Sequence, residues 1–213
     1  MTWWPSYSRE CRREINAILT RGGSLSSYRA NPGSGLGPSK GSQPWRLERE
    51  IEKQFNVKNC IAVSSGTAGL HAGLDALGVA GREVITSPFT FSATASAILL
   101  AGGVPRFADI DRYHFCITPE TVKPHITEKT AAILPVHLFG YFQDLSGFKQ
   151  FGLPIIEDAC QAVGACRLSE EAKSGKVWAG TTGLAGCYSF NGGKNIPAGE
   201  GGDVGCQGEA CER

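Results

Sequence analysis

The sequence contains no run of apolar residues long enough to cross a bilayer, which takes about 20 consecutive residues. Its first residues mix Arg, Glu and Trp instead of forming the apolar segment of a secretion signal. Clusters of Lys and Arg are also absent, and 21 basic against 20 acidic side chains leave a formal charge of +1. These absences exclude a membrane and nucleic acid as expected partners, and they predict a cytoplasmic protein.

The sequence also lacks a C-x-x-C pair, although it contains eight cysteines. They are scattered along the chain, and several lie inside apolar segments. Neither a disulfide framework nor a zinc site follows from this spacing, so we expect no metal. We interpret the cysteines as buried or incidental thiols in a reducing compartment, an interpretation that is weakest for Cys206 and Cys211.

What is present is the composition of an ordinary globular protein. With 213 residues, 41% hydrophobic and 19% charged, the chain suits one domain with a substantial core, or one domain with an incomplete neighbour. Residues 1–42 are rich in Gly, Ser, Pro and Arg, which predicts an arm or loop. The domain itself is expected over residues 43–213.

Helical and strand patterns alternate through that domain. A helix is expected over residues 45–55, where apolar side chains recur at helical spacing. Short apolar strands then alternate with helical stretches, which predicts βαβ units and a mostly parallel sheet in an α/β fold. The expected strands span residues 60–63, 83–85, 104–108, 131–136, 153–157, 184–190 and 202–205, and the further helices span 68–77, 93–101 and 145–151.

The first candidate motif is Ser64-Ser65-Gly66-Thr67-Ala68, between a predicted strand and a predicted helix. Small residues at a helix N-terminus let backbone N–H groups face an anion, and a Ser or Thr hydroxyl adds a donor. A turn of this composition is more often plain helix capping. Taken alone, the motif leaves both interpretations open.

The second motif places two carboxylates, Glu157 and Asp158, at the end of the strand expected over residues 153–157. Open α/β sheets bind ligands at the carboxyl ends of their strands, so an acid there is a candidate functional group. Because side chains alternate across a strand, the two carboxylates are expected to point in opposite directions. This disfavours a hydrolase with paired carboxylates and leaves one acid to serve a site.

The third motif is a glycine-rich turn with a single lysine. It reads Tyr188-Ser189-Phe190-Asn191-Gly192-Gly193-Lys194-Asn195. A lone Lys in such a turn is usually a solvated surface charge. The other motifs change that expectation, because all three occur together in one known order.

In order and spacing the motifs resemble the DegT/DnrJ/EryC1/StrS family of sugar aminotransferases, which are fold type I enzymes dependent on pyridoxal 5′-phosphate (PLP). The resemblance covers roughly residues 33–205. It implies a three-layer α/β/α PLP-dependent transferase large domain with a mostly parallel central sheet, and a homodimer. The blocks that carry it are residues 65–71, 88–94, 109–111, 135–140, 157–162, 189–190, Lys194 and 199–202.

Two residues take catalytic roles if the resemblance holds. Lys194 would bind the PLP aldehyde as a Schiff base and, once released by the incoming amine, would move a proton between Cα and the cofactor. Asp158 would keep the pyridine nitrogen protonated, so that the ring withdraws electrons from the reacting carbon.

The resemblance assigns the remaining cofactor contacts to five residues. Gln161 would donate a hydrogen bond to the phenolic oxygen of PLP, and Phe91 would stack on the ring. Gly66 and Thr67 would hold the phosphate at a helix N-terminus, and Ser189 would add a hydroxyl.

The activity implied is transfer of an amino group from glutamate or glutamine to a keto-sugar attached to a nucleoside diphosphate. Relatives that perform dehydration carry His in place of the lysine, and Lys194 argues against that branch. Family members continue into a smaller C-terminal domain, which is missing here after Arg213. We therefore also expect that the chain could bind PLP yet turn over poorly, or bind a cofactor or partner without catalysis. For His71 and His137, both in apolar runs, we favour a structural role.

Overall fold

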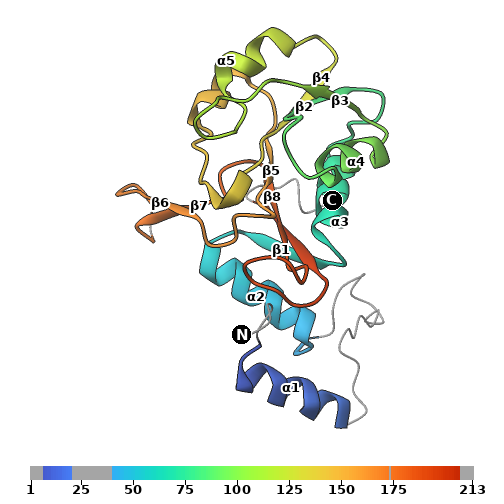
Figure 1. The fold of residues 1–213 in the computed structure, drawn as a ribbon, viewed down its shortest axis with the longest axis vertical. Coiled ribbons are helices and arrows are strands. Elements are labelled where there is room, and N and C mark those ends of the chain that lie inside the picture. The colour runs from blue at the N-terminus through green and yellow to red at the C-terminus, as the bar shows by residue number, and fades with distance from the viewer. Residues whose placement is uncertain (1–6, 21–39, 173, 207–213) are drawn as a thin grey trace.

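The computed structural model describes residues 7–20, 40–172 and 174–206, and Figure 1 shows its elements. The helices are α1 (Arg9–Thr20), α2 (Gln43–Phe55), α3 (Gly66–Ala76), α4 (Ala93–Leu100) and α5 (Pro119–Val122), and the 3₁₀ helices are η1 (Lys123–His125), η2 (Leu138–Gly140) and η3 (Ser146–Phe151). The strands are β1 (Asn59–Val63), β2 (Glu83–Thr86), β3 (Val104–Phe107), β4 (Thr130–Leu134), β5 (Ile156–Asp158), β6 (Cys166–Leu168), β7 (Lys176–Trp178), β8 (Ala185–Ser189) and β9 (Gly202–Cys206).

A central sheet is built from two hydrogen-bonded parts, ordered β3-β2-β4 and β5-β8-β9-β1. Parallel bridges from Ile133 to Ile155 and from Val136 to Asp158 join β4 to the segment of β5. β9 runs antiparallel to both of its neighbours, and the other ladders of this sheet are parallel. The prediction of a mostly parallel sheet is confirmed.

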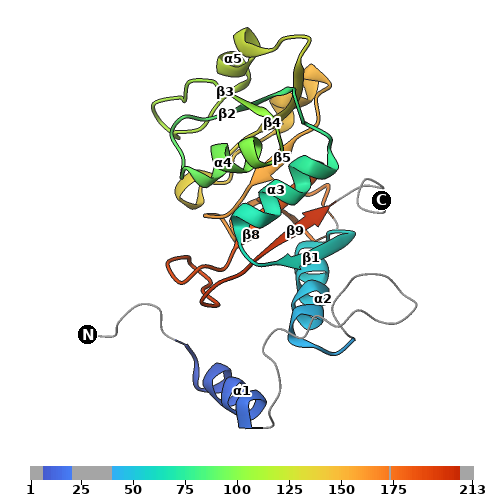
Figure 2. The ribbon, with the colours of Figure 1, turned by 90° about the vertical axis from the view of Figure 1, so that its right-hand side faces the viewer.

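Helices and loops cover both faces of the sheet, because strand side chains alternate between two cores. Leu70 and Leu74 of α3 pack with Ile98 of α4 on one face, over Val84 and Ile156 of the sheet. Figure 2 is viewed from the side on which α3 and α4 lie. The opposite face is covered by α2 near β1 and β8, and by α5 and η3 near β4. This arrangement is the predicted three-layer α/β/α architecture.

Local sequence determines where α2 begins and ends. The Ser42 side chain caps its N-terminus by accepting a hydrogen bond from the N–H of Trp45 at 3.4 Å, and a proline occupies the first turn. Asn56 ends the helix in the left-handed conformation, with φ of 53°. Ile51 and Phe55 form the buried stripe that holds α2 against the sheet.

The same helix protects the edge strand β1. The Glu52 carboxylate accepts a hydrogen bond from the N–H of Cys60 at 3.1 Å, and the Glu48 carboxylate accepts one from the N–H of Ala62 at 3.0 Å. An unprotected edge would leave these donors to water or to another chain. Burial is the main cause that raises the pKa of Glu48.

Several elements differ from the sequence-based expectations. α1 lies within the segment predicted as an arm, and it has no buried residue. The helix expected over residues 145–151 is the 3₁₀ helix η3. An antiparallel hairpin of β6 and β7 was not predicted. Among the described residues, no helix combines the length and apolar character needed to span a membrane.

The described cysteines are thiols, as expected from the sequence, with one exception. Cys11, Cys60, Cys116, Cys160, Cys166 and Cys187 are free thiols. Cys206, at the end of β9, is disulfide-bonded, which corrects the expectation of thiols at this position. Cys211 lies outside the described residues.

Candidate active site

A pocket of about 390 Å³ lies at the carboxyl ends of β5 and β8, beside the N-termini of α3 and α4. All seven residues that the sequence nominates for cofactor contacts line it. They are Gly66, Thr67, Phe91, Asp158, Gln161, Ser189 and Lys194. Lys194 and Asp158 therefore share one cavity, of a size typical for sites that bind small molecules.

One end of the pocket is the N-terminus of α3. The Ser65 side chain caps this helix by accepting a hydrogen bond from the N–H of Ala68 at 3.2 Å. The N–H groups of Gly66 and Thr67 belong to the first turn, where no helical carbonyl is available to pair with them. Ser189, at the end of β8, also lines the pocket and lies beside Gly66, since a Cβ atom at Gly66 would be 2.9 Å from the Ser189 Cβ. These donors suit an anion such as a phosphate.

Gly66 is required by this packing. A Cβ atom at this position would lie 2.5 Å from the Cys160 sulfur and 2.9 Å from the Ser189 Cβ. Such contacts are far inside van der Waals separation, so any larger residue would displace the helix start or its neighbours. The glycine thus allows α3 to approach the strand ends closely.

Asp158 is the last residue of β5, and its carboxylate is oriented by the protein. Thr94 Oγ1 donates to Oδ2 at 2.7 Å, and the backbone N–H of Cys160 donates to Oδ1 at 3.1 Å. The Thr94 hydroxyl also lies 2.9 Å from the hydroxyl of Thr90. Each carboxylate oxygen therefore has a protein partner, and the group is held in one direction toward the pocket it lines.

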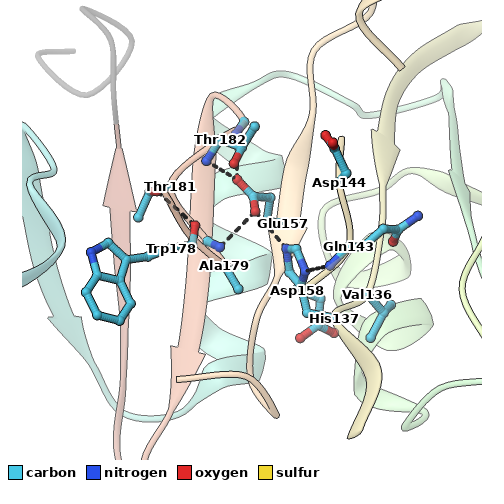
Figure 3. Close-up of polar contacts among 12 residues, drawn as sticks. Val136, His137, Gln143, Asp144, Glu157, Asp158, Trp178, Ala179, Thr181 and Thr182 are labelled. Carbon is cyan, nitrogen blue, oxygen red and sulfur yellow. Dashed lines mark hydrogen bonds and ion pairs between the residues drawn. The ribbon is translucent and has the colours of Figure 1, made fainter. Parts of the chain in front are cut away.

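Glu157 points to the opposite face of the strand, as alternation predicted, and Figure 3 shows its surroundings. Its carboxylate accepts hydrogen bonds from the N–H groups of Gly180 at 2.7 Å, Thr182 at 2.6 Å and Gly183 at 2.5 Å. His137 Nε2 lies 2.7 Å from the same carboxylate. Glu157 is fully buried and ties the segment before β8 to β5.

His137 has the structural role that we favoured. Its Nδ1 accepts the backbone N–H of Gln143 at 3.1 Å, so the ring proton is on Nε2 and is donated to Glu157. The ring is fully buried and does not line the pocket. His71, on α3, also lies outside the pocket lining.

Lys194 lies at the tip of the connection between β8 and β9, which backbone hydrogen bonds close into a narrow loop. The N–H of Lys194 donates to the carbonyl of Asn191 at 2.9 Å, and the N–H of Gly192 donates to the carbonyl of Gly199 at 2.8 Å. The Asn191 side chain also donates to the Glu200 carboxylate at 2.8 Å. The lysine is thus carried by a defined turn, not by an open surface loop.

Gln161 and Phe91 complete the lining. The backbone N–H of Phe139 donates to Gln161 Oε1 at 3.0 Å. This contact fixes the amide orientation and leaves its NH₂ group as the available donor, in agreement with the role implied for it. Phe91 is two-thirds exposed, at 66%, so it is not a core aromatic residue.

Sequence reasoning missed several pocket residues, among them Thr90, Thr94, Cys160, Asn191 and Glu200. All five fall inside the motif blocks quoted above, and that membership was the signal that could have found them. Burial, followed by the nearby Asp158 carboxylate, raises the pKa of the Cys160 thiol well above its usual value. This keeps the thiol protonated and agrees with an inert packing role.

The residues in this pocket fit PLP. The helix N-terminus suits its phosphate, the oriented Asp158 carboxylate suits a protonated pyridine nitrogen, and the Lys194 amine suits its aldehyde. Fold and pocket together define the large domain of a fold type I PLP-dependent transferase.

The sequence profile of the DegT/DnrJ/EryC1/StrS aminotransferase family matches residues 32–212, and the chain belongs to this family. PLP is the cofactor of the family. A pleiotropic regulatory protein of Geobacillus stearothermophilus is 44% identical over 165 residues, which is 75% of this chain and 42% of that protein. GDP-perosamine synthase of Vibrio cholerae is 37% identical over 176 residues, 80% of this chain and 46% of that enzyme. The chain thus spans somewhat less than half the length of these relatives.

Solved structures are similar over nearly the whole chain. An aminotransferase from Psychrobacter cryohalolentis superposes with a TM-score of 0.82 and 30% identity, over 98% of this chain and 50% of that one. NtdA from Bacillus subtilis, solved with bound cofactor PMP, gives a TM-score of 0.74 and 32% identity, over 93% of this chain and 41% of that one.

Proposed function

We propose that this chain forms the PLP-binding part of an enzyme that transfers an amino group from glutamate or glutamine to a keto-sugar linked to a nucleoside diphosphate. The observation that carries the proposal is the convergence of Lys194, Asp158 and the N-terminus of α3 on one pocket. The similarity to GDP-perosamine synthase supports a sugar nucleotide as the acceptor. The proposal also includes that residues 43–213 form one domain. It further includes that the protein is a homodimer and that it is cytoplasmic.

Bound PLP supplies an aldehyde that condenses with amines and a ring that accepts electrons from the reacting carbon. Lys194 would supply the amine that holds the cofactor covalently, and once freed its Nζ would serve as the base for the proton at the reacting carbon. The loop closed by Asn191 would keep this amine at the pocket that it lines.

Asp158 would hold the proton on the pyridine nitrogen. Its carboxylate is already oriented by Thr94 and by the N–H of Cys160, so no reorganisation is needed when the cofactor binds. Gln161 would donate its NH₂ group to the phenolic oxygen.

The rest of the cofactor is held by packing and by anion contacts. Phe91, an exposed aromatic residue that lines the pocket, would cover the ring. Gly66, Thr67 and Ser189 would bind the phosphate through two backbone N–H groups and a hydroxyl.

An absorbance titration of the chain with PLP tests the proposal. We expect a band shifted from that of free PLP, which is lost in Lys194→Ala and retained in Lys129→Ala, a matched change at an exposed lysine remote from the pocket. Borohydride reduction followed by peptide mapping should locate the cofactor on Lys194. A spectrum of free PLP only, or a label on other lysines, would refute the assignment.

Turnover is tested separately by adding glutamate to the PLP-loaded chain. Conversion of the bound cofactor to its amine form supports an aminotransferase. Binding without conversion would favour the alternative, a chain that binds PLP but does not catalyse transfer by itself.

A further inference from the structure

Three phenylalanine rings meet on the surface beside the pocket. Phe89 and Phe115 come from separate loops and Phe139 from η2, and the centroids of each pair of rings lie 5.8 to 6.4 Å apart. The residues are exposed by 46%, 42% and 72% respectively. We call these three residues the Phe cluster. Its rings contact one another without being buried in a core, which marks a candidate binding surface.

The position of the Phe cluster follows from the sheet topology. Phe89 follows β2, Phe115 lies in the turn after β3, and Phe139 follows β4. These strands are parallel, so their carboxyl ends meet at one edge of the sheet. Asp158 ends β5, which bridges to β4 in the same parallel sense. The Phe cluster therefore continues the row of strand ends on which the pocket is built.

Two direct links connect the Phe cluster to the pocket. Phe89 precedes Thr90 and Phe91, both of which line the pocket. Phe139 donates its backbone N–H to the side chain of Gln161, another lining residue, at 3.0 Å. The Phe cluster thus adjoins the lining of the pocket at two points.

The rings are held in place by their backbone. Phe115 and Phe139 have φ of 60° and 54°, a left-handed conformation that bulky side chains rarely adopt. The turn around Phe115 is fixed by the Asp111 carboxylate, which accepts the N–H groups of Tyr113 at 2.8 Å and His114 at 2.9 Å. Backbone strain of this kind is found at ligand-binding segments, where it presents a side chain before the ligand arrives.

We propose that the Phe cluster stacks the planar base of the nucleotide part of the substrate. This inference rests on the proposed function, in which the sugar carbonyl reacts near Lys194 and the nucleotide extends out of the pocket. Aromatic faces stack on any base, so the Phe cluster contributes affinity and leaves the identity of the base to other contacts.

Calorimetric titration of the PLP-loaded chain with GDP and with TDP tests the proposal. Phe139→Asn and Phe115→Asn remove a ring but keep a residue that tolerates positive φ, so the fold is preserved. Each change should weaken nucleotide binding by roughly fivefold to a hundredfold, the usual effect of losing one base-stacking aromatic. Leu100→Asn is the control, an exposed apolar residue at the C-terminal end of α4 that does not line the pocket, and it should leave binding unchanged.

The PLP absorbance band, recorded for every variant, separates the two proposals. Equal nucleotide affinity in all variants, with the PLP band retained, would overturn the stacking role and leave the proposed function intact. Failure of the PLP-loaded chain to bind either nucleotide would also overturn the stacking role. Loss of the PLP band in the unmodified chain would overturn both. Sedimentation of the same variants measures the mass of the assembly. If the Asn variants changed this mass and left the nucleotide affinity unchanged, the Phe cluster would be a contact between two copies of the chain. That result would also overturn the inference.

Discussion

Asp203, on β9, lies fully buried, and within the described part of the chain neither carboxylate oxygen has a hydrogen-bond partner. Burial first, and then the nearby Glu48 carboxylate, raises the pKa of Asp203 from 3.8 to about 7. We predict that Asp203→Asn removes a pH-dependent penalty on folding. Asn has nearly the same shape and cannot ionise.

The magnitude follows from the shift of the pKa. At 1.36 kcal/mol per unit, the shift corresponds to about 4 kcal/mol. Because the folded carboxyl group binds its proton more tightly than the unfolded one, stability decreases as pH rises from about 4 to about 7, and the loss is complete above that range. The free energy of unfolding of Asp203→Asn relative to the unmodified chain should therefore increase by about 4 kcal/mol between pH 4 and pH 8.

Urea denaturation at a series of pH values, followed by tryptophan fluorescence, measures this difference. Asp75→Asn is the matched control, since its carboxylate on α3 is exposed and hydrated in both states. Its pH profile should run parallel to that of the unmodified chain. A parallel profile for Asp203→Asn as well would refute the reasoning, because it would mean that folding does not raise the pKa of Asp203.

Two further predictions concern Glu157 and Gly66. Glu157→Gln should lower the free energy of unfolding in urea by about 3 kcal/mol, because an amide NH₂ would face buried N–H donors such as that of Gly180; an unchanged value would contradict its tethering role. Gly66→Ala should weaken PLP binding by an overpacking cost of about 1–3 kcal/mol, since its Cβ would meet the Cys160 sulfur at 2.5 Å. Gly73→Ala on the same helix has its nearest heavy atom at 3.8 Å and should bind PLP normally in the same absorbance titration.

The strands and their alternation with helices could be predicted from the sequence because their signals are local. Apolar runs at β2, β4 and β8 mark buried strands, and the small residues before α3 mark a helix start. Elements without such a pattern were missed. The β6–β7 hairpin is largely exposed and carries no alternation, and η3 lacks the length of a periodic helix.

The sequence by itself determined which groups can do chemistry and the order in which they occur, from the turn before α3 to Lys194. Only the tertiary structure decided which of them meet. Asp158 faces the pocket because Thr94, 64 residues away in sequence, holds its carboxylate, while Glu157 is turned into a buried network with His137. The Phe cluster and the unpaired Asp203 arise in the same way. Each depends on contacts between distant segments, and such contacts leave no periodic signal in a single sequence.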